Sequence, residues 1–399
     1  MQTSQNSSFD LPPADTGLRQ RTVSDIWADV RYPLGVFLVT RLGLYFVVSL
    51  SFILLPYTNP QFGRLASPLV NGWASWDGSW YGGIAQGGYQ CGPLNPEGMR
   101  NVAFFPLFPL AVRAVMLVVH DPNLAGLIVS NVSFLIALVL LFQIVRARFD
   151  EAVARRTVVL LAVFPFAMFF GAAYTKSITL VALVAAFFFG ERRQWFLAGV
   201  CAAFASAARM VGVLLIPALA LLYLSQIHFN WRLIRPNILW LGLGALGIGS
   251  YAAYLGATCG DPLLFAKSQF VAGWMLGVDA NMAKGVIEAA PRIPYVGDTE
   301  RREITGLLMH LMFAGWAIVL AALSWRLLPS AYALLATLMV FSSLSHWDGM
   351  GRYVVVIFPL FMVAALLLKS ERWYTAVVYT CVLLLGLFAT VFTHAYWLA

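Results

Sequence analysis

A lone carboxylate among aromatic rings is the first feature of this sequence that could carry out chemistry. Asp77 lies in the stretch WASWDGSWYGGIAQGGY, residues 73–89, which contains five aromatic side chains. A carboxylate can accept a proton from a substrate hydroxyl. The rings of Trp76, Trp80 and Tyr81 could stack on a sugar and line the site of such a reaction. We therefore take Asp77 as a candidate catalytic base.

Apolar residues after this carboxylate recur at helical spacing: Trp80, Tyr81, Ile84 and Ala85. This pattern predicts an amphipathic helix lying at a membrane surface, with Asp77 at or near its N-cap. A helix N-terminus favours a negative charge, which suits an ionised carboxylate. The alternative is that Asp77 only caps the helix and that the rings form an aromatic belt at the membrane interface.

The composition indicates that the elements carrying these residues are membrane helices. The chain has 399 residues, of which 60% are hydrophobic and 11% are charged, with a mean hydropathy of +0.78. Soluble domains average about 25% charged residues. Apolar runs of roughly 17–25 residues recur from about residue 32 onward, and each could cross a ~30 Å hydrocarbon layer. The predicted fold class is an all-α polytopic membrane protein.

Composition also excludes several partners and cofactors. The net charge is +8, but the arginines are scattered through short loops and form no basic stripe, so no nucleic-acid partner is expected. There are four cysteines without a CxxC pair, and no convincing metal-ligand cluster, so we predict no metal and no cofactor. Cys91 and Cys259 both fall in expected outer loops and could pair in an oxidising compartment, although free thiols are favoured.

The distribution of arginines predicts the orientation. Residues 1–30 are polar and are expected to form a disordered cytoplasmic tail, because Arg19, Arg21 and Arg31 place the N-terminus inside. Residues 31–399 would form a single transmembrane domain. The first span is expected at about residues 32–56, followed by an outer loop over residues 57–122.

The apolar run 102–120 within this loop looks like another span, but orientation argues against a crossing. If it crossed, the four arginines of the stretch 146–156 would lie outside, against the positive-inside rule. Arg113 lies in the middle of the run, and an arginine at the bilayer centre costs roughly 2.5–3.5 kcal/mol on insertion scales. We therefore expect an interfacial helix on the outer side.

Ten more spans are expected to follow, which makes about eleven in all, with the C-terminus outside and a second outer loop over residues 257–305. The later ten are expected at about residues 123–145, 157–173, 175–190, 195–210, 211–227, 237–256, 306–325, 329–345, 350–368 and 373–395. With this topology, every unusual polar residue of the apolar part gathers at the outer side.

Several stretches, taken together and in order, resemble the PIG-V group of GPI mannosyltransferases and their bacterial relatives. They are WASWDGSWYGGIAQGGYQ followed by AFFPLFPL, then FPFAMFFGAAYTKS (164–177), GDPLLFAKSQ (260–269) and GRYVVVIFPLF (351–361). The resemblance covers nearly the whole membrane part. One departure is Lys176, which stands where the family often has a glutamate, so a role for that acid cannot be carried over.

The resemblance implies a GT-C glycosyltransferase with Asp77 as the catalytic base. Such an enzyme would move mannose from a polyprenyl-phosphate-mannose donor to an outer-leaflet glycolipid or glycan. The short chain and its motifs favour the plasma membrane of a prokaryote, with the active site on the outer face. An inverting transfer needs one carboxylate, whereas a retaining one would want a second about 5–5.5 Å away.

The departing lipid phosphate needs cations on the opposite side of the sugar. Arg352 is the first candidate, since a guanidinium matches phosphate bidentately, and Arg209 at an expected outer turn is the second. Lys176 and His346 are weaker candidates. Each of these side chains could instead anchor the end of a span at the interface.

Four further polar or aromatic side chains on the outer side are weaker candidates for a role in the site or in its structure. Asp348 is a rival base, although it lies four residues before Arg352 and could simply pair with it or orient the acceptor. Gln269 and Trp274 could line an acceptor cleft. Asp261, which precedes a proline, is expected to cap the start of a helix.

Two other functions remain open from the sequence. The first is a lipid flippase or small-solute transporter, although transporters usually show internal repeats and charges at the membrane midplane, and we find no convincing repeat. The second is a non-catalytic membrane subunit that binds a glycolipid.

Overall fold

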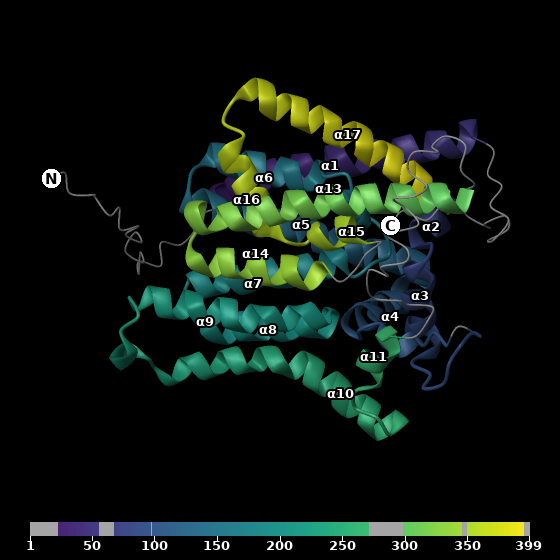
Figure 1. Cartoon of the computed structure of the whole chain (residues 1–399), viewed down its shortest axis with the longest axis horizontal. Helices are drawn as coiled ribbons and strands as arrows, with labels where there is room; N and C mark the ends of the chain where they lie inside the picture. The colour runs from purple at the N-terminus through teal and green to yellow at the C-terminus, as the bar shows by residue number, and fades with distance from the viewer. Residues whose placement is uncertain (1–22, 56–67, 97, 271–297, 345–348, 395–399) are drawn as a thin grey trace.

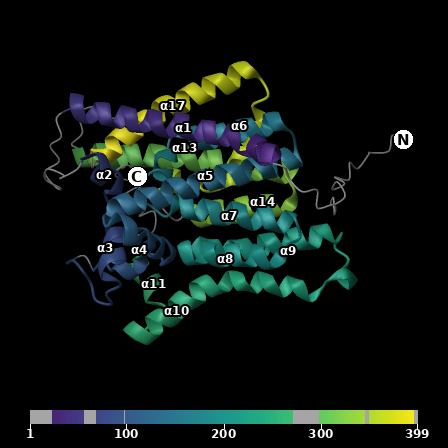
Figure 2. The ribbon, with the colours of Figure 1, turned by 180° about the vertical axis from the view of Figure 1, so that it is seen from behind.

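The computed structural model describes residues 23–55, 68–96, 98–270, 298–344 and 349–394, and every regular element in them is helical. The helices lie side by side as a bundle (Figure 1), with the same arrangement seen from behind in Figure 2. The all-α polytopic class is thus confirmed. Five helical stretches are long and apolar enough to cross a membrane, so the expected count of about eleven spans is not confirmed. Two of them are whole helices, α5 (Pro122–Arg148) and α17 (Glu371–Thr393). Two are parts of longer helices: Asp29–Leu54 in α1 (Val23–Leu54) and Leu308–Leu327 in α13 (Asp298–Leu327). The fifth, Pro236–Cys259, includes α10 (Leu246–Cys259) and the helical turns before it.

Shorter helices complete the bundle. Those with ten or more residues that pack within the bundle are α6 (Glu151–Val163), α7 (Lys176–Glu191), α8 (Trp195–Ala208), α9 (Leu215–Gln226), α14 (Ser330–Ser343) and α16 (Phe358–Leu367). Several boundaries differ from expectation, and two of them concern the start of a helix. Helix α1 begins at Val23, so the last part of the expected tail is helical, and α13 begins at Asp298, inside the expected second outer loop.

One end of the bundle is held by ion pairs. Arg148 on α5 contacts Glu191 on α7 at 2.5 Å, and Arg156 on α6 contacts Glu371 on α17 at 3.1 Å. Asp29 near the start of α1 also pairs with α5, through Arg146. This is the end that the arginine distribution assigns to the cytoplasm. At the end opposite to the first outer loop, these ion pairs therefore join α1, α5 and α7 in one set and α6 and α17 in a second.

The first outer loop covers the other end with short helices: α2 (Pro68–Asn71), α3 (Asp77–Gly87) and α4 (Leu107–Val119). In Figure 1 they lie together with α11 (Leu264–Lys267) at this end. Asn123 at the start of α5 donates to Asn71 of α2 at 2.8 Å. Helix α1 ends and α5 begins at this same end, as expected if residues 102–120 do not cross the membrane.

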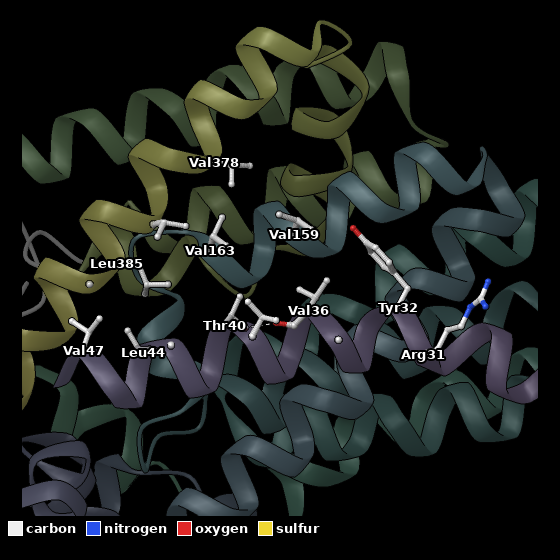
Figure 3. Close-up of a pocket in the computed structure, with 15 residues that line it drawn as sticks. Arg31, Tyr32, Val36, Thr40, Leu44, Val47, Val159, Val163, Val378 and Leu385 are labelled. Carbon is white, nitrogen blue, oxygen red and sulfur yellow. Dashed lines mark hydrogen bonds between the residues drawn. The ribbon is translucent and has the colours of Figure 1, made fainter. Parts of the chain in front are cut away.

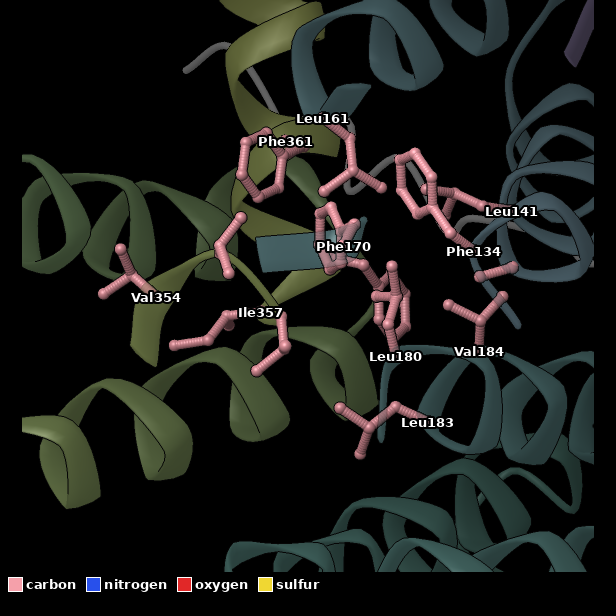
Figure 4. Packing of buried hydrophobic residues seen from close by; sticks show 14 of the residues in the cluster. Phe134, Leu141, Leu161, Phe170, Leu180, Leu183, Val184, Val354, Ile357 and Phe361 are labelled. Carbon is pink, nitrogen blue, oxygen red and sulfur yellow. The ribbon is translucent and has the colours of Figure 1, made fainter. Parts of the chain in front are cut away.

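A buried break in the backbone separates α6 from α7. Residues 164–175 leave the α-helix and remain buried throughout. Arg41 of α1 reaches this break and donates to the carbonyl oxygens of Ala162 and Ala167, at 3.2 and 3.1 Å. Non-helical backbone at membrane depth needs such partners, because no water is available there. Figure 4 shows Phe170 from the break packed with Phe134 of α5, whose ring lies 4.4 Å away.

Cys91 and Cys259 form a disulfide, with a Cα–Cα distance of 5.5 Å, so the preference for free thiols was wrong. The two cysteines meet because the first outer loop docks on α10 through its own small core. Tyr251 of α10 is buried there with Phe105 and donates its hydroxyl proton to the carbonyl of Val102 at 2.8 Å. This docking brings together residues that are 168 positions apart.

We expect Gly351→Ala to destabilise the protein by about 1–3 kcal/mol, the usual cost of overpacking a core. A Cβ at this position would overlap the Phe166 ring. That ring is buried and cannot move away, since the rings of Phe313 and Phe388 lie 5.0 and 5.3 Å from it. Unfolding in mixed micelles measures the loss. Gly249→Ala is the control, because Gly249 is exposed on α10 with open space around it. Equal stability of the two variants would contradict the packing argument.

Candidate active site

The chain makes a strained turn just before Asp77. Trp76 has φ 59° and ψ −120°, a conformation that is rare for a residue with a side chain. The buried hydroxyl of Tyr174 clamps both sides of this turn. It donates to the carbonyl of Ser75 at 3.0 Å and accepts from the backbone N–H of Asp77 at 3.2 Å. Strain of this kind persists only where surrounding contacts impose it, and it is found mostly at functional sites.

Asp77 is the first residue of α3, close to the expected cap position. Its carboxylate does not bond to the helix backbone. Instead Oδ2 accepts a hydrogen bond from Nη1 of Arg352, at 3.1 Å. Arg352 lies on α15 (Met350–Val354), which precedes α16. The Asp77 side chain is 22% exposed and that of Arg352 is 10% exposed, so the carboxylate retains access to solvent or substrate.

Three cations surround the ring of Tyr353. The Nζ atom of Lys176 lies 4.3 Å from the ring centroid, and the guanidinium carbons of Arg209 and Arg352 lie 4.9 and 5.4 Å from it. Such contacts are attractive because the faces of an aromatic ring carry partial negative charge. The three cations come from different elements: the first residue of α7, the residue between α8 and the following turn, and α15.

Among the residues that the structure describes, three cations of this cluster face one carboxylate. Lys176 is 2% exposed and starts α7, whose N-terminus adds partial positive charge. Asp77 is the one carboxylate that bonds to the cluster among the residues described. Like charges held together away from water are unfavourable, and an anion bound among them would relieve the repulsion. The arrangement therefore suits a phosphate, which guanidinium groups and helix N-termini bind well.

The aromatic residues predicted to line the site differ in burial. Tyr81 lies in the core, with its ring edge-to-face against Phe104 and Phe108, at 4.9 and 5.1 Å. Its hydroxyl lies 3.5 Å from Thr175, beside the cation cluster, and its contact with substrate stays a prediction. Trp80 stacks on Phe104 at 5.7 Å and, like Trp76, is half-buried. These two tryptophans remain candidates for contact with substrate.

The second outer loop contributes contacts of a structural kind. Gln269 donates to the carbonyl of Ala103 at 3.0 Å and so joins this loop to the first. Asp261 accepts from the backbone N–H of Leu263 at 3.0 Å in the turn before α11, and its other oxygen contacts Lys267 at 2.6 Å. The N-cap of α11 is Leu263, so Asp261 does not cap this helix as expected. The hydrogen bond from Lys267 lowers the pKa of Asp261. Three other predicted site residues, Trp274, His346 and Asp348, lie outside the described part of the chain.

Three residues of the site were not predicted: Tyr174, Thr175 and Tyr353. Thr175 accepts from Nη1 of Arg209 at 3.5 Å, and the Tyr81 hydroxyl lies 3.5 Å from the same oxygen. Thr175 directly precedes Lys176, Tyr174 lies two residues before it, and Tyr353 directly follows Arg352, within FPFAMFFGAAYTKS and GRYVVVIFPLF. Adjacency to Lys176 and Arg352 was therefore the available signal. The absence of a metal or cofactor from the reaction stays a prediction.

Comparison with solved structures identifies the architecture. ArnT from Cupriavidus metallidurans, bound to undecaprenyl phosphate, matches with a TM-score of 0.52 and 14% identity, over 86% of this chain and 62% of its own. An oligosaccharyltransferase from Archaeoglobus fulgidus, in complex with Zn and sulfate, matches with a TM-score of 0.50 and 14% identity, over 89% of this chain and 53% of its own. The chain has a GT-C-like fold. It spans only about half to three fifths of these two proteins' lengths.

The sequence comparisons gave one family match, which covers part of the chain. Residues 103–253 match a family model described as dolichyl-phosphate-mannose-protein mannosyltransferase. The comparison with curated protein sequences gave no match. None of these findings singles out the PIG-V group. The GT-C-like fold and the candidate site are therefore the basis for the function proposed below.

We expect Tyr174→Phe to lower the free energy of unfolding by about 1–3 kcal/mol, because two buried backbone groups lose their partner. Tyr81→Phe is the matched control, since its hydroxyl makes only the long 3.5 Å contact with Thr175 and should cost less. Unfolding of both variants in mixed micelles measures the difference. If the control lost as much stability as Tyr174→Phe, the clamp on the Trp76 turn would be refuted.

Proposed function

We propose that this protein is an inverting glycosyltransferase, which moves a sugar from a polyprenyl-phosphate donor to a hydroxyl of a glycolipid or glycan. The observation that carries the proposal is one carboxylate, Asp77, held beside three cations in a GT-C-like fold. The family match at residues 103–253 and the undecaprenyl phosphate bound by ArnT support a lipid-linked donor. Mannose as the sugar rests on the family match and the sequence resemblance.

Asp77 acts as the general base. The acceptor oxygen forms a bond to the anomeric carbon while the bond from that carbon to the phosphate oxygen breaks. The phosphate leaves with the bonding electrons, and the hydroxyl proton passes to Asp77. A weak carboxylate base suffices if the proton moves late, when the oxocarbenium-like centre has already acidified the hydroxyl. One carboxylate is enough for this single displacement.

Lys176 and Arg209 hold the phosphate. The donor is a phosphodiester with one negative charge, and its departure creates a phosphomonoester that carries close to two. Cations placed around the leaving group therefore interact more strongly with the transition state than with the donor, which lowers the barrier. Arg352, our first candidate for the phosphate, is bonded to Asp77. We assign it the role of orienting the carboxylate.

The reaction takes place on the outer face of a prokaryotic plasma membrane, and no metal or cofactor takes part. The ion-paired end of the bundle carries the arginines expected in the cytoplasm, and Asp77 lies at the other end. The Cys91–Cys259 disulfide at that end supports an oxidising surrounding.

The charged side chain of Arg41, which lies within the membrane-spanning part of α1, gives no support to the transporter hypothesis. Transport sites use charged groups near the midplane of the membrane. Arg41 is such a group, but it bonds to carbonyl oxygens of the buried break. A non-catalytic glycolipid-binding subunit would need the cations but not a carboxylate beside them.

We expect Asp77→Asn to lower turnover by about 10²–10⁴-fold, the usual contribution of a general base, because an amide keeps the shape but cannot take the proton. Transfer of labelled mannose from polyprenyl-phosphate-mannose to membrane glycolipids in proteoliposomes measures it. Asp150→Asn is the control, since Asp150 caps α6 at the ion-paired end and asparagine caps equally well. Near-normal turnover by Asp77→Asn would refute the base assignment.

Loss of a phosphate-binding cation should weaken the binding of the donor substrate. We expect Lys176→Met and Arg209→Gln each to raise the KM for the donor by roughly 10–100-fold, since hydrogen bonds to charged groups contribute about 1.5–3 kcal/mol. The KM for the acceptor should change little. Steady-state kinetics with each substrate varied in turn separates the two effects, and Arg232→Gln, at an exposed arginine between α9 and α10, is the control. An effect on the acceptor KM alone would contradict this assignment.

A further inference from the structure

A cavity lies on the side of the bundle, and Asp77 is not part of its lining. It has a volume of about 640 Å³ and is formed by α1, α6 and α17. Figure 3 shows its lining: Val36, Leu44 and Val47 from α1, Val159 and Val163 from α6, and Val378 and Leu385 from α17. The walls are almost wholly apolar. In a membrane protein, a lateral apolar cavity of this kind is accessible to hydrocarbon chains.

Glycines on α1 create the hollow. Gly35, Val39 and Gly43 recur at intervals of four residues, so they lie on one face of the helix. A Cβ added at Gly35 or Gly43 would meet no atom within 4 Å. The lining runs along α1 from Arg31 to Val47, which corresponds to about 24 Å at 1.5 Å per residue. This length suits an extended acyl chain within a hydrocarbon layer of ~30 Å.

One end of the cavity lining is charged and lies at the ion-paired end of the bundle. Arg31 and Tyr32 line it, and Arg155 lies over the Tyr32 ring at 4.9 Å. Arg155 pairs with Glu151 at 2.5 Å. Arg31 is exposed and has no carboxylate partner among the side chains that the structure describes. A cation beside an apolar groove is complementary to a lipid with an anionic headgroup.

We propose that this groove binds an anionic glycerophospholipid, with one acyl chain between α1 and α17 and the phosphate against Arg31. The site is independent of the proposed reaction, because Arg31 lies at the opposite end of the bundle from Asp77 and the lining shares no residue with the candidate active site. The bound chain supplies packing that α17 lacks, since several large apolar side chains of this helix are exposed. Anionic lipid therefore stabilises the contact between the first and last described helices.

Native mass spectrometry of the full chain tests the headgroup. We expect phosphatidylglycerol to bind about fivefold or more tightly than phosphatidylcholine with the same acyl chains, the effect of one basic residue at a membrane surface. Arg31→Gln should remove about fivefold of the affinity for phosphatidylglycerol and leave phosphatidylcholine unchanged. Arg232→Gln, at another exposed arginine, should behave as the wild type. Equal affinity of the wild type for the two lipids, or unchanged binding by Arg31→Gln, would overturn the proposal.

Filling the groove tests the acyl-chain site. Gly43→Leu should weaken binding of both lipids and abolish the rise in melting temperature that phosphatidylglycerol gives. Gly315→Leu is the matched control, because Gly315 is exposed on α13 with open space around it and gains the same helix propensity. Its lipid binding should equal that of the wild type. If Gly43→Leu retained wild-type binding, the lipid would lie elsewhere on the protein. Neither measurement depends on glycosyl transfer, so each outcome stands apart from the proposed activity.

Discussion

The candidate site depends on one buried phenol. By bonding to the carbonyl before Trp76 and to the N–H after it, the Tyr174 hydroxyl holds a backbone conformation that the chain would otherwise leave. That conformation starts α3 at Asp77 and directs the carboxylate toward Arg352. Tyr174 itself belongs to the buried break between α6 and α7. The position of the carboxylate is therefore set by the interior of the bundle rather than by the outer loop that contains it.

The break also positions a cation. Because the backbone leaves the helix at Phe164 and resumes it at Lys176, the lysine occupies a helix start inside the protein. Arg41 makes this possible by bonding to carbonyl oxygens near the break. Such satisfaction is needed because unpaired backbone groups are costly in a membrane interior. A buried arginine that looks like a transport charge thus supports the geometry of a site at the other end of the bundle from the ion pairs.

Much of the fold and part of the site could be predicted from the sequence. Hydropathy gave the all-α membrane class, and helical spacing placed Asp77 at a helix start, because both depend on local patterns. The contact between Asp77 and Arg352 joins residues 275 positions apart, which no local pattern specifies. Hydropathy also counted residues 157–173 as a span, although the helix ends at Val163. The Cys91–Cys259 pairing was named as possible but not favoured, because it depends on the docking of segments that are far apart in the sequence.

That disulfide separates the residues of the candidate site into two groups. It closes residues 91–259 into a covalent ring, which contains Lys176 and Arg209 but neither Asp77 nor Arg352. The exposed link between α9 and the helical run that starts at Pro236 lies within the ring. A protease that cuts this link would leave the two fragments joined, and they would separate on a denaturing gel only after treatment with a thiol reductant.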